Sequence, residues 1–172
     1  MLFRSFFART PDLRRLLLSQ DVIYVGGGNT KSMLAVWRDW DLPRLLRQAW
    51  RQGIVLTGVS AGAICWFTRG ITDSWADHLQ VLPCLDFLPG TACPHYDGEA
   101  DRRPSVHRFV TDRAVASVLA LDDGAAAHFT GRRLTRIVAS RQKAAGYDVR
   151  LRRGTVVETP YPVERLPRRR VR

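Results

Sequence analysis

Two short apolar segments, each followed at once by a glycine-rich turn and a helix-like stretch, constrain the fold of this chain most. The first reads DVIYVGGGNT at residues 21–30, and the second reads IVLTGVSAGA at residues 54–63. Continuous apolar runs rich in β-branched residues are typical of strands buried on both faces of a parallel sheet. The alternation of strand, turn and helix therefore predicts an α/β fold, with a mainly parallel sheet flanked by helices.

The stretch between these two segments has a helical pattern that Pro43 interrupts. Asn29 or Thr30 is expected to cap the start of the first helix, and Gly53 to end the second. In parallel α/β sheets, ligands bind beyond the carboxyl ends of the strands. Both glycine-rich turns lie at such ends, so we expect them to face one crevice.

The second half of the chain alternates loops with hairpin patterns. Residues 71–104 are rich in turn-forming residues and predict loops, and residues 105–121 have a helical pattern. Residues 124–140 and 146–161 predict two late β-hairpins, each with a glycine at its turn.

The composition is that of one globular domain. The chain has 172 residues, of which 45% are hydrophobic, enough for a core. We expect a single domain over residues 1–160 and a basic, flexible tail over residues 161–172. No apolar run reaches the roughly 18 residues that a membrane span needs. Three cysteines without metal-ligand spacing indicate free thiols and a reducing compartment, so we expect a cytoplasmic location.

The net charge is +11, and arginine supplies nearly all of the positive charge. Such a balance raises nucleic-acid binding as a competing hypothesis. The arginines are dispersed along the chain, except in the segment ERLPRRRVR at its end. Because a binding surface requires clustered charge, we do not expect nucleic acid to be the main partner.

Ser60 stands in the sequence GVSAG, which matches the G-x-S-x-G pattern of a serine nucleophile on a strained strand-to-helix turn. Gly58 and Gly62 would permit close packing around it, and the Ala61 N–H could donate to an oxyanion. The pattern alone is also compatible with a tight turn that has no chemical role.

The Gly26–Gly28 turn matches neither common nucleotide-binding glycine motif. Its lack of side chains would let backbone N–H groups approach a developing oxyanion. The turn therefore fits better as a second oxyanion donor beside Ala61 than as a phosphate site.

A serine nucleophile needs a base and a group that orients the base. Among the four histidines, His95 is favoured, because it lies in a loop after a proline, and functional residues concentrate in loops. The residues alone leave the orienting carboxylate open among four aspartates, which are Asp73, Asp97, Asp122 and Asp123. Cys65 and Cys93 are interpreted as small buried residues rather than nucleophiles.

The motifs VGGGNT, GVSAGA, PHYDGE and LDDGAA, in this order, resemble the serine peptidase family of aspartyl dipeptidase (peptidase E) and cyanophycinase. The resemblance covers roughly residues 12–139 and is closest to a peptidase E-like subset that is not aspartate-specific. It implies a class I glutamine amidotransferase-like fold, hydrolysis of short peptides and a homodimer. It implies neither a metal nor an organic cofactor.

Carried onto this sequence, the resemblance assigns a catalytic triad. Ser60 matches the nucleophile and His95 the general base. Asp123 matches the third member, where aspartyl dipeptidases carry glutamate. Asp122 stays possible, because aspartate is shorter than glutamate and needs a closer backbone.

The resemblance also assigns the surroundings of the triad. The N–H groups of Gly27 or Gly28, together with that of Ala61, match the oxyanion hole. Asn29 and Asp73 are expected on the substrate-binding side, and Asp73 could bind the free amino group of a peptide.

The chain departs from the family pattern in two ways. Ser105 stands where aspartyl dipeptidases place an arginine that binds the substrate aspartate, and neighbouring arginines such as Arg102, Arg103 and Arg108 are not well placed to replace it. We therefore expect no strict aspartate specificity. The family's usual N-terminal βαβ segment is also expected to be missing, which would expose apolar surface. An inactive family member with a binding role is the alternative.

Overall fold

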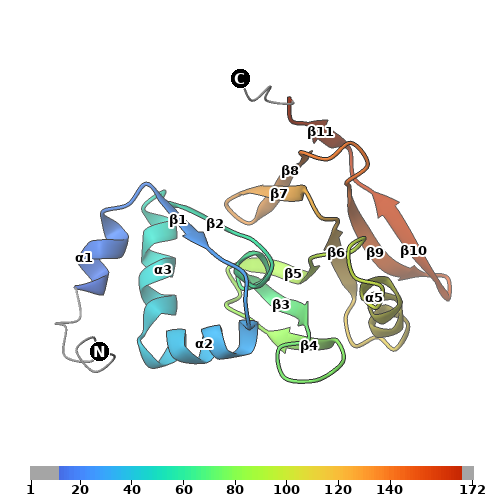
Figure 1. Cartoon of the computed structure of the whole chain (residues 1–172), viewed down its shortest axis with the longest axis horizontal. Coiled ribbons are helices and arrows are strands. Elements are labelled where there is room, and N and C mark those ends of the chain that lie inside the picture. The colour runs from blue at the N-terminus through green and yellow to red at the C-terminus, as the bar shows by residue number, and fades with distance from the viewer. Residues whose placement is uncertain (1–11, 168–172) are drawn as a thin grey trace, which may run out of the picture.

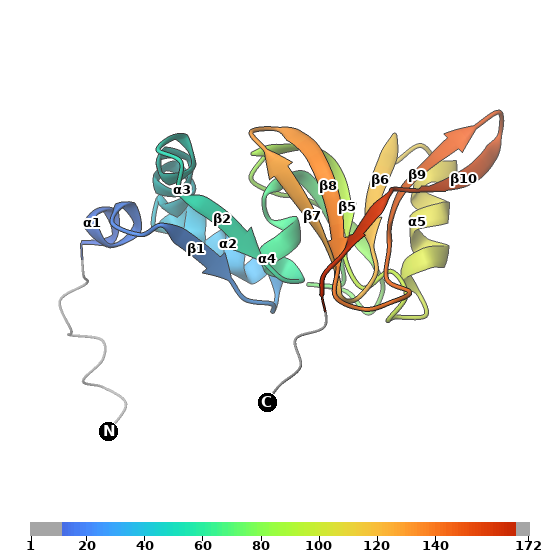
Figure 2. The same cartoon turned by 90° about the horizontal axis from the view of Figure 1, so that it is seen from above.

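The computed structural model describes residues 12–167 and shows an α/β protein (Figures 1 and 2). The helices are α1 (Leu13–Leu18), α2 (Thr30–Asp39), α3 (Leu42–Arg51), α4 (Ala61–Ile64) and α5 (Arg102–Thr111). The strands are β1 (Val22–Val25), β2 (Val55–Gly58), β3 (Phe67–Thr72), β4 (Gln80–Pro83), β5 (Leu88–Cys93), β6 (Ser117–Leu121), β7 (Ala125–Thr130), β8 (Arg133–Ala139), β9 (Gly146–Arg152), β10 (Thr155–Pro160) and β11 (Val163–Arg165).

The strands form three sheets rather than one parallel sheet. β1 and β2 make a parallel pair, a six-stranded sheet has the order β10-β9-β6-β5-β3-β4, and a three-stranded sheet has the order β11-β8-β7. Within the large sheet, β3, β5 and β6 run parallel, whereas β4, β9 and β10 pair antiparallel. The α/β class is confirmed, but the sheet is mixed because the second late hairpin extends it. The glutamine amidotransferase-like arrangement stays a prediction.

The helical stretch between the first two strands is interrupted as predicted. Asn29 caps α2, since its side chain accepts a hydrogen bond from the Ser32 N–H. Asp41 adopts a left-handed conformation between the two helices, and Pro43 lies in the first turn of α3. Gly53 follows α3 with a φ of 89°, a conformation that favours glycine.

Three segments differ from their prediction. The helix after Ser60 ends at Ile64, and the chain continues directly into β3. The region predicted as loops contributes β4 and β5, and the helix predicted over residues 105–121 divides into α5 and β6. Apolar residues of these segments line a common core, in which Val106 of α5 packs with Val118 of β6. Tertiary packing therefore overrides the local helical pattern. Both late hairpins are confirmed.

The β1–β2 pair is covered on one face only. Ile23, Val25 and Leu56 pack against Leu34 of α2 and Leu46 of α3. The prediction that both strands are buried on both faces is wrong, because no described element lies on the other face.

On that uncovered face, Val22, Tyr24 and Val55 are 53%, 65% and 55% exposed. Apolar surface is thus exposed, as expected. The absence of the family's N-terminal strands stays a prediction.

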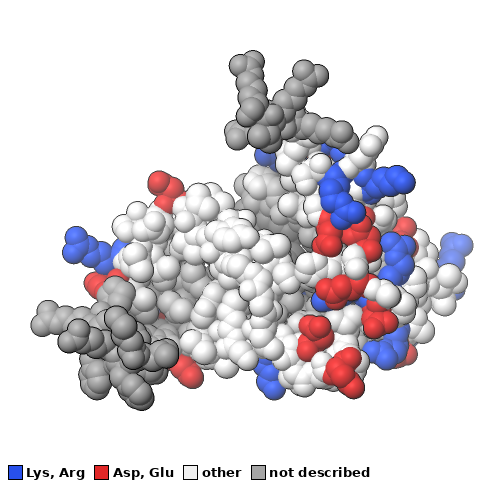
Figure 3. Space-filling model, in the orientation of Figure 1, with Lys and Arg blue, Asp and Glu red and all other residues white. Residues whose placement is uncertain are grey.

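Charged residues are unevenly distributed over the face shown in Figure 3. Arginines and acidic residues alternate on the C-terminal half, whereas the part over β1 and β2 carries almost no charge. Several arginines pair with carboxylates, among them Arg103 with Glu158, at 2.9 Å, and Arg136 with Glu164, at 3.3 Å. The face in view therefore presents no continuous basic surface.

The end of the described chain is partly ordered by strand pairing. β11 lies within the segment predicted as a flexible tail, and it pairs in parallel with β8 through Val163 and Ile137. Residues 163–165 thus differ from the prediction, because they complete a sheet. Residues 168–172 lie outside the described residues. Among the helices of the described part, none is long and apolar enough to cross a membrane.

Candidate active site

His95 and Asp123 follow two neighbouring parallel strands. His95 comes two residues after β5 ends at Cys93, and Asp123 comes two residues after β6 ends at Leu121. The two strands pair in parallel, with Cys93 opposite Ala120. Because the carboxyl ends of parallel strands lie at one edge, the fold brings these two residues together from distant parts of the chain.

The glycine-rich turns follow the strands of the separate β1–β2 sheet, and contacts connect this part of the chain to the large sheet. The Thr30 N–H, at the start of α2, donates to Ser74 Oγ at 2.9 Å, just beyond the end of β3. Ile64 of α4 packs with Ala92 of β5. Figure 2 shows α4 between the β1–β2 pair and the rest of the molecule. These contacts place the turn after β1 and Ser60 after β2 beside the ends of β3 and β5.

Ser60 has a strained backbone at the junction of β2 and α4. Its φ is 55° and its ψ is −118°, which is rare for a residue with a side chain. Gly58 and Gly62 make this turn possible, as the pattern predicts. A Cβ on Gly58 would lie 2.6 Å from the Val25 oxygen, and one on Gly62 would lie 2.8 Å from the Gly26 oxygen. Strain concentrates at functional sites, so this turn is a strong candidate for a chemical role.

Backbone donors surround Ser60. A Cβ on Gly27 would lie only 3.3 Å from the Ser60 Cβ, so the glycine turn directly faces the serine. Gly28 has a φ of 146°, which requires glycine. Within residues 12–167, the N–H groups of Gly27, Gly28 and Ala61 donate to no protein acceptor. They are available to a substrate oxygen.

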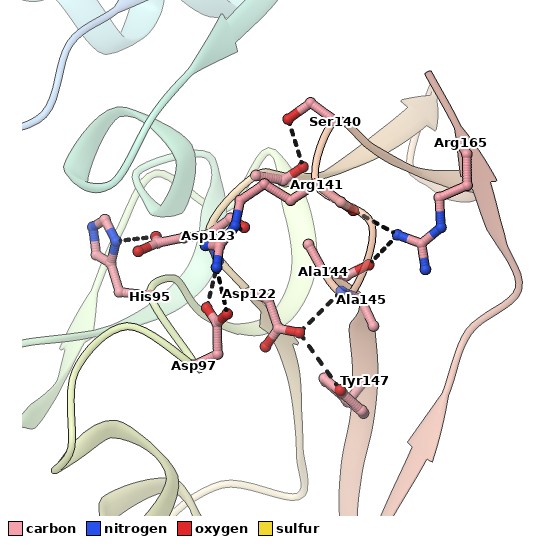
Figure 4. A network of polar contacts seen from close by, with 11 residues as sticks. His95, Asp97, Asp122, Asp123, Ser140, Arg141, Ala144, Ala145, Tyr147 and Arg165 are labelled. Carbon is pink, nitrogen blue, oxygen red and sulfur yellow. Dashed lines mark hydrogen bonds and ion pairs between the residues drawn. The ribbon is translucent and has the colours of Figure 1, made fainter. Parts of the chain in front are cut away.

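His95 is paired with Asp123 (Figure 4). Its Nδ1–H donates to Asp123 Oδ1 at 2.6 Å, and the two side chains are 26% and 43% exposed. This bond leaves the Nε2 lone pair free, because no group of residues 12–167 bonds to it or to the Ser60 hydroxyl. His95 also has a positive φ, of 54°. Ser60 and His95 therefore both occupy strained backbone positions.

Asp122, the alternative partner of His95, faces elsewhere. It is buried, and its Oδ2 accepts the Ala145 N–H at 2.9 Å. Burial raises the pKa of the Asp122 carboxyl above its ordinary value. The structure thus places Asp123, and not Asp122, on the histidine.

The two predicted substrate-binding residues differ in availability. Asn29 uses both polar atoms of its side chain within the fold, since Oδ1 accepts the Ser32 N–H and Nδ2 donates to the Ser74 carbonyl. Asp73 lies at the end of β3 and is exposed. Asp73 is therefore better placed than Asn29 to contact a substrate.

The arginines near the position of Ser105 are already engaged. Arg102 is buried, donates to Glu99 at 2.7 Å and bonds to the Ile71 carbonyl. Arg103 pairs with Glu158 and stacks over the Tyr96 ring. Arg108 lies over the ring of Phe109, on its own helix. Arg102 and Arg103 thus have polar partners within the fold, whereas Arg108 contacts the ring of its neighbour.

The three cysteines are poor candidates for nucleophiles. Cys65 and Cys93 are buried, and Cys84 is partly buried. Burial raises the pKa of the Cys84 and Cys93 thiols to about 12 and that of Cys65 still further. Thiolates are therefore scarce at neutral pH.

Two residues contact the backbone of Asp123 in a way that the sequence did not predict. The Asp123 N–H donates to Asp97 Oδ1 at 2.7 Å, and Arg141 Nη1 donates to the Asp123 carbonyl at 3.0 Å. The sequence had offered Asp97 only as one of four candidates to orient His95. It gave no signal for Arg141, which lies 18 residues after Asp123 in another turn.

Comparison with known proteins identifies the family of this chain. The model of peptidase family S51 matches residues 4–137. The chain belongs to this family. A curated relative from Bacillus subtilis (strain 168), named "Uncharacterized peptidase YgaJ", is 48% identical over 157 residues, which cover 91% of this chain and 68% of the relative.

Membership of peptidase family S51 confirms the family resemblance and supports a peptidase function. The residues that carry the reaction and the substrate are matters for proposal.

Proposed function

We propose that this protein is a serine peptidase that cleaves short peptides, with Ser60, His95 and Asp123 as its catalytic triad. The hydrogen bond of 2.6 Å between His95 and Asp123 carries the proposal. It joins two residues 28 positions apart, which follow the neighbouring strands β5 and β6. A histidine oriented in this way beside a strained serine is the arrangement required for nucleophilic catalysis.

The reaction is acyl transfer. Asp123 accepts a hydrogen bond from the Nδ1–H of His95 and stabilises the imidazolium that forms when Nε2 takes the hydroxyl proton of Ser60. The Ser60 oxygen attacks the carbonyl carbon of the peptide, and His95 returns the proton to the leaving amine. Water, activated by His95, then attacks the acyl ester and releases the second product.

The glycine turn supplies charge stabilisation. As the tetrahedral intermediate forms, its oxygen becomes negative and needs hydrogen-bond donors. Gly27 lies against Ser60, Ala61 follows the serine directly, and the N–H groups of Gly27, Gly28 and Ala61 are free of protein acceptors within residues 12–167. Fixed backbone donors need no rearrangement during the reaction.

The substrate class follows from the residues around the triad. The carboxylate of Asp73 would bind the free amino group of a short peptide. Ser105 stands in place of the family arginine, and Arg102 and Arg103 are engaged elsewhere, so neither of these two arginines is free to bind a substrate aspartate. The enzyme should therefore accept neutral residues at this position.

The test is hydrolysis of a panel of dipeptides, with and without N-terminal aspartate, by the purified chain and its Ser60→Ala variant. Ser19→Ala, at the end of α1, is the matched control. Activity that disappears only in Ser60→Ala, without preference for aspartate, is the expected result. A folded parent without activity on any peptide would favour an inactive family member with a binding role.

Three further parts of the proposal rest on the family resemblance and the composition. These are a homodimer, a reaction without metal or organic cofactor, and a cytoplasmic location. Sedimentation velocity tests the first, activity after treatment with a chelator tests the second, and cell fractionation tests the third.

A further inference from the structure

The backbone of Asp123 is bound on both of its polar sides. Its N–H donates to Asp97 Oδ1 at 2.7 Å, and its carbonyl accepts from Arg141 Nη1 at 3.0 Å. Arg141 Nη2 also lies 3.6 Å from Asp97 Oδ2. Asp97, Asp123 and Arg141 therefore close a ring of polar contacts behind the carboxylate that pairs with His95 (Figure 4).

The ring joins three separate loops. Asp97 follows β5, in the same loop as His95, and Asp123 lies between β6 and β7. Arg141 follows β8, and its carbonyl accepts a hydrogen bond from Arg165 at 2.9 Å. Because loops move more than the strands they connect, the distance between His95 and Asp123 depends on contacts such as these.

Neighbouring glycines leave room for the ring. A Cβ on Gly98 would collide with the Asp123 carboxylate, whose Cγ would lie 3.2 Å away. A Cβ on Gly124 would lie 2.7 Å from Arg141 Cδ. The Arg141 stem and the Asp123 carboxylate thus occupy space that these glycines leave open.

The short side chain of aspartate explains why the backbone of Asp123 must be held in place. Aspartate has a single methylene between its backbone and its carboxyl group, so the backbone largely determines where the carboxylate lies. A hydrogen bond weakens steeply when its distance or angle departs from the optimum. A displacement of 1 Å in a catalytic group can cost about 100-fold in rate.

We propose that Asp97 and Arg141 are positioning residues, which act through Asp123 to keep the His95 imidazole in its working tautomer and orientation. The link to catalysis rests on the proposed function, whereas the effect on the His95–Asp123 bond does not.

The experiment compares the parent with Asp97→Ala and Arg141→Ala. Arg136→Ala is the matched control, since Arg136 also pairs with a carboxylate, is similarly exposed and does not touch Asp123. Imidazole ¹⁵N chemical shifts report the tautomer of His95, and Asp123→Ala gives the reference for complete loss of the bond. The same proteins are assayed for kcat, KM and Tm.

We expect Asp97→Ala and Arg141→Ala to move the His95 ¹⁵N shifts toward those of Asp123→Ala, and to lower kcat by about 10- to 100-fold with little change in KM. Arg136→Ala should resemble the parent. Asp97→Asn should keep most of the parent behaviour, because its side-chain oxygen can still accept the Asp123 N–H. If Asp97→Ala fails to fold, Arg141→Ala carries the test.

Parent-like ¹⁵N shifts in both alanine variants would overturn the positioning role. A parent without peptidase activity would instead count against the proposed function, and the ¹⁵N shifts would still decide the positioning of His95.

Discussion

Replacement of Gly62 by alanine tests how the turn around Ser60 is built. A Cβ at this position would lie 2.6 Å from the Val25 carbonyl carbon and 2.8 Å from the Gly26 oxygen, both of which belong to the backbone. Ordinary van der Waals contact begins at 3.4 Å, so the end of β1 and the start of α4 must separate by several tenths of an ångström. Backbone cannot rotate away as a flexible side chain can.

The cost follows from this overpacking. Extra methyl groups in well-packed sites destabilise proteins by about 1–3 kcal/mol. With a urea m-value of about 2 kcal/mol per molar, a loss of 2 kcal/mol lowers the midpoint of unfolding by about 1 M. Since the strain falls on the two turns that face each other at Ser60, kcat/KM should fall as well, by up to about 100-fold.

The assay is urea unfolding followed by tryptophan fluorescence, together with dipeptide hydrolysis. Gly26→Ala is the control, because a Cβ at this neighbouring glycine would meet no atom within 4 Å. We expect Gly26→Ala to unfold at nearly the parent midpoint. Equal midpoints for Gly62→Ala and Gly26→Ala would refute the packing that we describe around Ser60.

Further predictions concern the aspartate pair and the cysteines. Asp123→Asn should lower kcat by about 10⁴-fold, as loss of the orienting carboxylate does in serine proteases, while Asp122→Asn should keep most of the activity; the reverse order would contradict the assignment of the triad. Burial raises the pKa of Asp122, so the folded state favours its neutral form, and the ionised carboxylate reduces stability at higher pH. Asp122→Asn should therefore raise the urea midpoint at pH 7, with a gain that shrinks below about pH 4, where the unfolded carboxyl is also protonated. A gain that grows at low pH would contradict this reasoning. The thiols of Cys65 and Cys93, which are buried, and of Cys84, which is partly buried, should react slowly with a disulfide reagent in buffer and quickly in denaturant. A fast native reaction would contradict their raised pKa values.

The candidate site was predictable from the sequence because its residues stand in local motifs. GVSAG placed Ser60 on a strained turn, and the structure gives that residue its positive φ. The choice between Asp122 and Asp123 was not decidable, because adjacent residues point in different directions and only the neighbouring strands show which one faces His95.

Other features of the fold could not be predicted from the sequence, because tertiary packing determines them. β1 and β2 belong to apolar runs, which predict burial on both faces, yet Tyr24 and Val55 are exposed because helices cover one face only. Arg141 contacts Asp123 across two turns, and no local pattern marks such a long-range polar contact.

The central claim is that Ser60 is a nucleophile activated by His95. The most direct measurement is the mass of the intact protein after reaction with a fluorophosphonate, followed by peptide mapping of the label. We predict a single adduct on Ser60 that forms much more slowly in His95→Ala and does not form in Ser60→Ala. A folded parent that acquires no label, or carries it on another residue, would contradict the claim.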